Sequence, residues 1–189
     1  MTKSAAANPP LTSQQILHPE KYYVKRKEPI WITPWGLFRQ FRGKKIMDET
    51  LGEFLIQFLL SRNLSKNEAM QAAAGWAGDS FLAFQEGDQT VLGWITAWDD
   101  REEALEFYRS YRTALERRHG ITLEPTSGSI DTLTAPLQSG HLLLQIRDNF
   151  VFFLDGVPVP RSVEIAEELW KELETGSEPQ PLDLAAKPR

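Results

Sequence analysis

The chain has 189 residues, of which 41% are apolar and 25% are charged, and it contains no cysteine. This length and composition are typical of one globular domain, and the absence of cysteine excludes disulfides, thiol nucleophiles and thiolate metal sites. No apolar run reaches the roughly 18 residues that a membrane-spanning helix needs, and the N-terminus lacks the apolar stretch of a secretory signal. We therefore expect one soluble domain without a membrane span, cytoplasmic by default.

Composition divides the chain into three regions. Residues 1–12 and 176–189 are small, polar and proline-containing, which predicts a disordered lead and a disordered tail. Residues 13–175 form the single folded domain. It begins with an aromatic and basic arm, about residues 20–45, in which residues 30–32 predict a short strand. Pro29 and Pro34 flank that strand and favour an edge position.

Helical periodicity predicts four helices in the body. The first covers residues 48–61, where Leu51, Phe54, Leu55, Phe58 and Leu59 recur at helical spacing behind Asp48 and Glu49. The second covers residues 66–74 behind a Ser-x-x-Glu capping pattern and stops at Gly75. The third covers residues 101–118, between an aspartate cap at 99 or 100 and Gly120. The fourth starts after Pro160.

Two hairpins alternate with these helices. The first joins residues 81–84 to 91–98 through a turn that contains Gly87, and the second joins residues 141–146 to 150–154. Residues 91–98 are apolar on both faces, which predicts a central strand covered on both sides. Residues 121–140 show only one weak edge strand, near 130–133. The pattern predicts an α+β fold: an antiparallel sheet of two hairpins and edge strands, covered by helices.

No complete catalytic set is visible in the sequence. His18, His119 and His141 are far apart, and no His-Glu-x-x-His pattern is present. Phosphate-binding glycine loops and the Gly-x-Ser-x-Gly nucleophile pattern are also missing. The many carboxylates of residues 101–118 fit a solvated helix face. We therefore predict no catalytic, metal or cofactor-binding residue, and no cofactor.

Trp76, Trp94 and Trp98 allow two interpretations. Six tryptophans in one domain could form an aromatic cage for a ligand. Indoles also bury a large apolar area, so the same residues suit a packed core. We favour the core, and keep these three residues as candidates for a ligand surface.

Basic residues are concentrated near the N-terminus. Residues 1–47 contain nine Lys and Arg but only two Glu, whereas the whole chain carries a net charge of −5, so the remainder is strongly acidic. The arm could face an anionic partner, with Lys25, Arg26 and Lys27 as the candidate surface. The alternative, which we favour, is that the two parts neutralise each other within one fold. The net acidity argues against a nucleic-acid partner.

Several short motifs occur in a recognisable order. They are HPEKY (residues 18–22), LGE (51–53), GWAGD (75–79), WD (98–99) and ALEF (104–107). Together they resemble the region that follows a gluzincin-like zinc peptidase domain in a group of largely uncharacterised bacterial proteins, over about residues 15–155. The zinc ligands of that group belong to the preceding domain, so the resemblance implies an accessory domain and supplies no catalytic residue.

These observations lead to one interpretation and two alternatives. The leading interpretation is a non-catalytic accessory or protein-interaction domain whose partner is another protein, bound through the arm. The first alternative is a small-molecule-binding domain or cryptic hydrolase with a pocket between the sheet and the helices. The second is a remnant peptidase, which would bind zinc.

Overall fold

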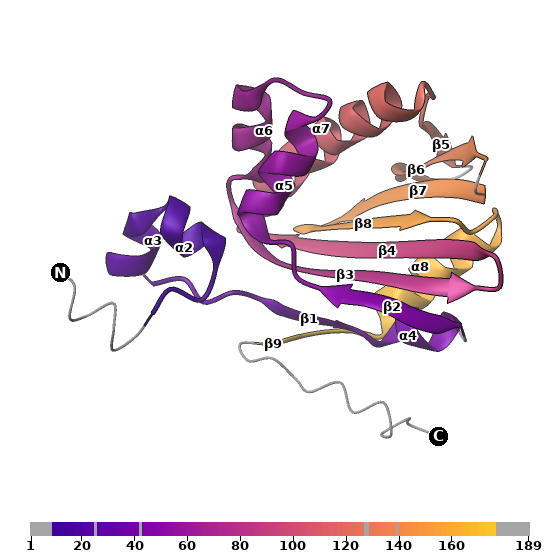
Figure 1. The fold of residues 1–189 in the computed structure, drawn as a ribbon, viewed down its shortest axis with the longest axis horizontal. Helices are drawn as coiled ribbons and strands as arrows, with labels where there is room; N and C mark the ends of the chain where they lie inside the picture. Colours follow the sequence, from indigo (N-terminus) through magenta and orange to yellow (C-terminus); the bar gives the residue numbers. More distant parts are fainter. Residues whose placement is uncertain (1–8, 25, 42, 127–128, 139, 177–189) are drawn as a thin grey trace.

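A seven-stranded antiparallel sheet lies at the centre of the molecule (Figure 1). The computed structural model describes residues 9–24, 26–41, 43–126, 129–138 and 140–176. The strand order is β2-β3-β4-β8-β7-β6-β5, and every neighbouring pair is antiparallel. This confirms the predicted α+β class. The strands are β2 (Lys44–Glu49), β3 (Trp76–Glu86), β4 (Gln89–Trp98), β5 (Glu124–Thr126), β6 (Ser129–Leu137), β7 (Gly140–Arg147) and β8 (Phe150–Asp155).

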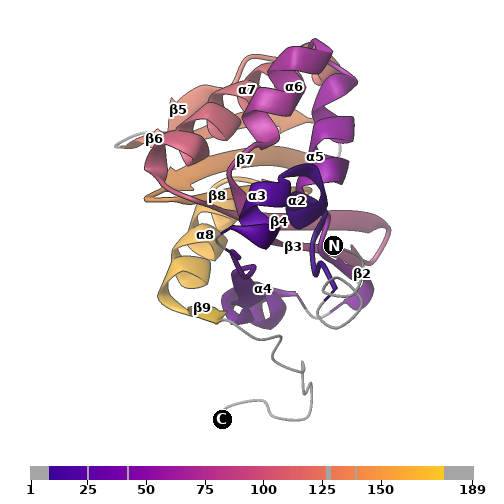
Figure 2. The same ribbon diagram turned by 90° about the vertical axis from the view of Figure 1, so that its left-hand side faces the viewer.

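Helices cover both faces of this sheet. Helices α5 (Gly52–Ser61), α6 (Lys66–Ala73) and α7 (Arg101–His119) lie on one face, and α4 (Trp35–Gln40) and α8 (Arg161–Lys171) lie on the other (Figure 2). Because side chains alternate along a strand, β4 sends Trp94 and Trp98 into the first layer and Val91 and Ile95 into the second. The predicted central strand is confirmed.

Both predicted hairpins form, and the first is longer than expected. Strand β3 begins at Trp76 rather than at Phe81, because residues 76–80 pair with the end of β4, with Trp76 opposite Trp98. Ala, Gly and Asp are poor strand formers, so this extension had no local signal. The predicted helix ends are confirmed: Ser65 and Glu68 form the capping box of α6, Asp100 caps α7, and Gly120 is left-handed.

The prediction for residues 48–61 was wrong at its start. Asp48 and Glu49 belong to β2, where they pair with Leu82 and Phe81, and α5 begins only at Gly52. The predicted apolar stripe is also not the buried one. The fully buried apolar side chains of α5 are Ile56 and Leu60, whereas Phe54, Leu55 and Phe58 are exposed and Leu51 and Leu59 are only partly buried. Both sides of this helix are apolar, so periodicity could not decide which side faces the core.

Other segments of the chain also differ from the sequence predictions. Residues 129–137 form a full strand, β6, where only a weak edge strand was predicted. Strand β9 (Leu173–Gly176), which had no sequence signal, pairs with the predicted short strand β1 (Trp31–Pro34). Helices α2 (Ser13–Leu17) and α3 (Pro19–Tyr23) precede β1. Of the predicted lead and tail, residues 1–8 and 177–189 lie outside the described residues.

The backbone between α3 and β1 contacts the start of β3. The amide of Ile30 donates to the carbonyl oxygen of Ala77 over 2.7 Å, and the amide of the Gln14 side chain donates to the Trp76 carbonyl oxygen. Gly78 lies under this contact, and a Cβ atom at Gly78 would clash with the Ile30 carbonyl oxygen. Glycine at this position therefore permits the two backbones to approach each other.

We predict that Gly78→Ala displaces the segment that carries Ile30 and lowers the free energy of unfolding by about 1–3 kcal/mol, as overpacking does. Gly120→Ala serves as the control, because Gly120 is left-handed but has open space around it, so that variant reports conformational strain alone. Urea unfolding measures both losses, and limited proteolysis reports release of the segment. If only Gly120→Ala raised cleavage within residues 13–30, this account of Gly78 would be wrong.

Candidate functional site

The carboxylate of Asp79 is only 4% exposed and is hydrogen-bonded to several parts of the fold. Its Oδ1 accepts hydrogen bonds from the Gly52 amide and the Trp76 indole, both over 2.9 Å. Its Oδ2 accepts from the Leu51 amide over 2.9 Å and from the Trp94 indole over 3.0 Å. Four donors thus surround one anionic group, which ties β3, β4 and the start of α5 together.

Asp79 also caps α5, although it is remote in sequence. Leu51 is the N-cap residue and Gly52 the first residue of that helix, and Leu51 has no side chain that could cap it. Asp79 accepts both of their amide protons, and Ser13 Oγ accepts the proton of the Phe54 amide over 3.3 Å. A helix N-terminus carries positive partial charge, so this position favours a carboxylate.

Two opposing effects act on the pKa of Asp79. Burial raises the pKa, because removal from water disfavours the charged form, and the four donated hydrogen bonds lower it. Burial is the larger effect, so the pKa lies above the usual value for aspartate. No described lysine, arginine or histidine forms an ion pair with Asp79.

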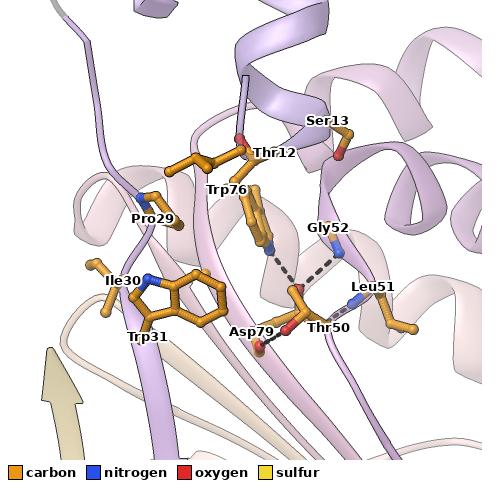
Figure 3. A pocket seen from close by; sticks show the side chains of 12 residues that line it. Thr12, Ser13, Pro29, Ile30, Trp31, Thr50, Leu51, Gly52, Trp76 and Asp79 are labelled. Atoms are coloured by element: carbon orange, nitrogen blue, oxygen red, sulfur yellow. Dashed lines mark hydrogen bonds between the residues drawn. The ribbon is translucent and has the colours of Figure 1, made fainter. Parts of the chain in front are cut away.

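A pocket of about 290 Å³ opens beside this cluster (Figure 3). Four chain segments form its wall: residues 11–13, residues 29–31, residues 50–52 and the start of β3. The rings of Trp31 and Trp76 line it, and Thr50 donates to the main-chain oxygen of Asp79 over 3.1 Å. Asp79 contributes the only formal charge among the described lining residues.

The three candidate tryptophans lie in the same core layer and share neighbours. All three are at most 2% exposed. Trp94 packs edge-to-face on Phe107, at 5.7 Å between ring centroids, and Trp98 stacks on Phe107 at 4.5 Å. The indole of Trp98 donates to Thr96 over 2.8 Å. Trp94 and Trp98 are therefore core residues, as favoured from the sequence, and Trp76 is the one of the three that also lines a pocket.

The candidate cations of the arm are engaged within the chain. Lys27 lies 2.8 Å from Asp99, which also pairs with Lys21 at 3.0 Å. Arg26 pairs with Glu28 at 2.6 Å and stacks over the Tyr22 ring. Lys25 lies outside the described residues. The pairs with Asp99 join the arm to the body of the domain, whereas Arg26 and Glu28 both belong to the arm.

Sequence reasoning missed the exposed side of α5. Phe54 is 57% exposed and Phe58 is 60% exposed, and Leu55 lies between them. A second pocket, of about 430 Å³, runs along the helix; it is lined by Leu51, Leu55, Phe58, Leu59, Arg62, Asn63 and Arg118. The sequence does show these residues as an apolar stripe, but the stripe was predicted to face the core.

The histidines show no metal site. His18 Nε2 lies 2.8 Å from the buried Glu53 Oε1, which also accepts from Gln57 over 3.1 Å. His18 Nδ1 lies 3.5 Å from Glu20. Among the described residues, no three His, Cys, Asp or Glu side chains come together as a metal ion would require. In the same part of the chain, no helix has the length and apolarity to cross a membrane.

The chain belongs to a family described as a domain of unknown function, DUF8575, whose profile matches residues 39–162. The match contains all seven strands of the central sheet, the exposed side of α5 and Asp79. The lining residues 11–13 and 29–31 of the smaller pocket precede it. Neither the curated proteins nor the solved structures contain a match to this chain.

We predict that Trp94→Phe lowers the free energy of unfolding by about 1 kcal/mol more than Trp98→Phe. Both changes remove an indole N–H from the same layer, but Trp94 donates to a carboxylate and Trp98 to a neutral hydroxyl, and bonds to charged groups are worth about twice as much. Urea unfolding of both variants provides the comparison. Equal losses of unfolding free energy in the two variants would show that the Asp79 carboxylate is not a stronger acceptor than the Thr96 hydroxyl.

The raised pKa of Asp79 predicts a pH dependence. The folded chain holds the Asp79 proton more tightly than the unfolded chain, so this group stabilises the fold below its unfolded pKa. That stabilisation is lost as the pH rises through the folded pKa. Asp79→Asn cannot titrate, so the unfolding free energy of the wild type should fall relative to this variant as the pH rises above the unfolded pKa of aspartate, about 3.9. A difference that instead grew with pH would indicate a lowered pKa.

Proposed function

We propose that this member of the DUF8575 family is a protein-interaction domain that binds its partner on the exposed side of α5. The observation that carries this proposal is the pair of exposed phenylalanines, Phe54 and Phe58, one turn apart on the same helix. Single exposed apolar residues are normal on any protein, but clustered ones mark interaction sites. Aromatic residues are also frequent among the side chains that dominate binding energy.

The exposed side of α5 is held in one arrangement before any partner arrives. Ile56 and Leu60 are fully buried on the opposite side of the helix, and Asp79 and Ser13 fix its first turn. A rigid surface loses little conformational freedom on binding, which favours affinity. The helix can therefore present Phe54, Leu55 and Phe58 as fixed anchors.

The charges beside the groove indicate what the partner offers. Arg62 follows α5, and Arg118 lies in the last turn of α7, and both line the larger pocket. Neither forms an ion pair with a described carboxylate. We therefore propose an amphipathic helix of another protein as the occupant, with apolar anchors toward Phe58 and acidic residues toward the two arginines.

This surface replaces the arm as the proposed binding region. The described candidate cations of the arm, Arg26 and Lys27, already have carboxylate partners in the same chain. Phe54, Leu55 and Phe58 of α5, in contrast, are between 45% and 60% exposed. An accessory role beside a zinc peptidase rests on the sequence resemblance alone. It is compatible with the same surface, because an accessory domain also needs a contact with the protein that it serves.

The proposal predicts site-specific crosslinking. A photo-reactive phenylalanine at position 58 should crosslink in cells to one protein, and the same group at Ile130, an even more exposed residue of β6, should not capture it. The crosslinked peptide of the partner should be an acidic amphipathic helix. Purified partner and chain should then form a complex whose dissociation constant can be titrated. Failure of the purified pair to bind would contradict the proposal.

With that complex, Phe58→Ser should weaken binding by about 30-fold, as loss of a central aromatic anchor does. Ile130→Ser should leave the affinity unchanged. Both variants should unfold within about 0.5 kcal/mol of the wild type, because both residues are exposed. Arg118→Glu should also weaken binding of the partner, and its effect should be larger at low salt than at high salt. If Phe58→Ser leaves the dissociation constant unchanged, the partner binds another surface and the proposal is wrong. If the chain alone self-associates in a concentration-dependent way, the occupant of this surface is a second copy of the chain.

A further inference from the structure

The smaller pocket combines aromatic rings with one buried negative charge. Trp31, Trp76 and Asp79 all line it (Figure 3). The two indoles are not among the ring pairs of the described chain, although such pairs are frequent elsewhere in it. No lysine, arginine or histidine is among its described lining residues.

The hydrogen bonds of Asp79 restrict the kind of ligand that this pocket suits. Both carboxylate oxygens already accept two donors each. A ligand would therefore be attracted by the negative charge but would find no free carboxylate oxygen to accept its protons. Besides the carboxylate, the side-chain acceptors of the pocket are the hydroxyls of Thr12, Ser13 and Thr50, and each already forms a hydrogen bond within the chain. A primary ammonium group would compete with these bonds for its N–H acceptors, which is costly in a buried site. A quaternary ammonium group has no N–H donors and does not incur this cost.

The rings favour the same chemistry. The face of an indole carries negative partial charge and is the strongest aromatic partner for an organic cation. Sites for quaternary ammonium ligands in proteins are commonly built from such rings. Trp31 is half-buried and is reached from solvent, whereas Trp76 is nearly covered and is fixed by its bond to Asp79.

We propose that the pocket lined by Trp31, Trp76 and Asp79 binds a small quaternary ammonium group. The volume of about 290 Å³ lies at the lower end of ligand sites in proteins, which suits a compact headgroup. This inference can fail independently of the binding surface on α5, because the ligand would contact Trp31 and Trp76, which do not belong to that surface. The ligand can be a free metabolite or the headgroup of a larger molecule, since both present the same cation.

Choline and its neutral isostere 3,3-dimethylbutan-1-ol provide the direct test. They have nearly the same shape and differ in the positive charge. Isothermal titration of the full chain should show saturable choline binding, with the isostere at least tenfold weaker. Equal affinity for the two probes would overturn the proposal, and so would the absence of choline binding up to 50 mM. Phosphocholine, tested in parallel, should bind if the site accepts substituted headgroups, and its exclusion restricts the ligand to a free cation.

Variants of Trp31 locate the site. Trp31→Leu should weaken choline binding by about tenfold, the loss expected for one indole face, and Trp31→Phe should restore part of it. Trp35→Leu is the matched control, because Trp35 is also half-buried but lies outside the pocket and bonds to Glu174. If Trp31→Leu does not fold, the comparison of Trp31→Phe with the wild type carries the test. Binding that is unaffected by both Trp31 variants would overturn the assignment of this pocket.

Discussion

The carboxylate of Asp79 is the interaction on which both proposed surfaces depend. It accepts two amide protons at the start of α5 and two indole protons from the paired strands β3 and β4. It therefore fixes the helix whose outer side carries Phe54 and Phe58, and it places the charged end of the smaller pocket. A buried anion normally needs a cation as partner, but here a helix N-terminus and four neutral donors replace the cation.

This arrangement explains why the start of α5 needs no local cap. The helix begins at a left-handed glycine, Gly52, after a residue with no capping oxygen. Capping side chains come from β3 and from α2, through Asp79 and Ser13. A helix capped by remote groups can form stably only when the sheet and the N-terminal segment are in place, because the unsatisfied amides would otherwise be exposed to the apolar interior. The orientation of α5 is thus a property of the whole fold.

The sequence predicted the features that depend on local chemistry. The capping box at Ser65, the cap at Asp100 and the stop at Gly120 are confirmed because neighbouring residues alone determine them. The start of α5, strand β9 and the early start of β3 were not predicted, because each depends on partners at least 15 residues away in the chain. The same limit applies to the sites. The motif that contains Trp76 and Asp79 was noticed, but Trp31, which completes the pocket, lies 45 residues earlier in the chain.

The two pockets share a structural element although they suit different ligands. Leu51 lines both, and its amide is one of the four donors to Asp79. An occupant of either pocket therefore contacts the residue that sets the start of α5. If binding at one pocket changes the position of Leu51, linkage requires that the second ligand affects the first by the same factor. Such coupling would pass through Asp79, because its carboxylate accepts hydrogen bonds from the start of α5 and from the indoles of Trp76 and Trp94.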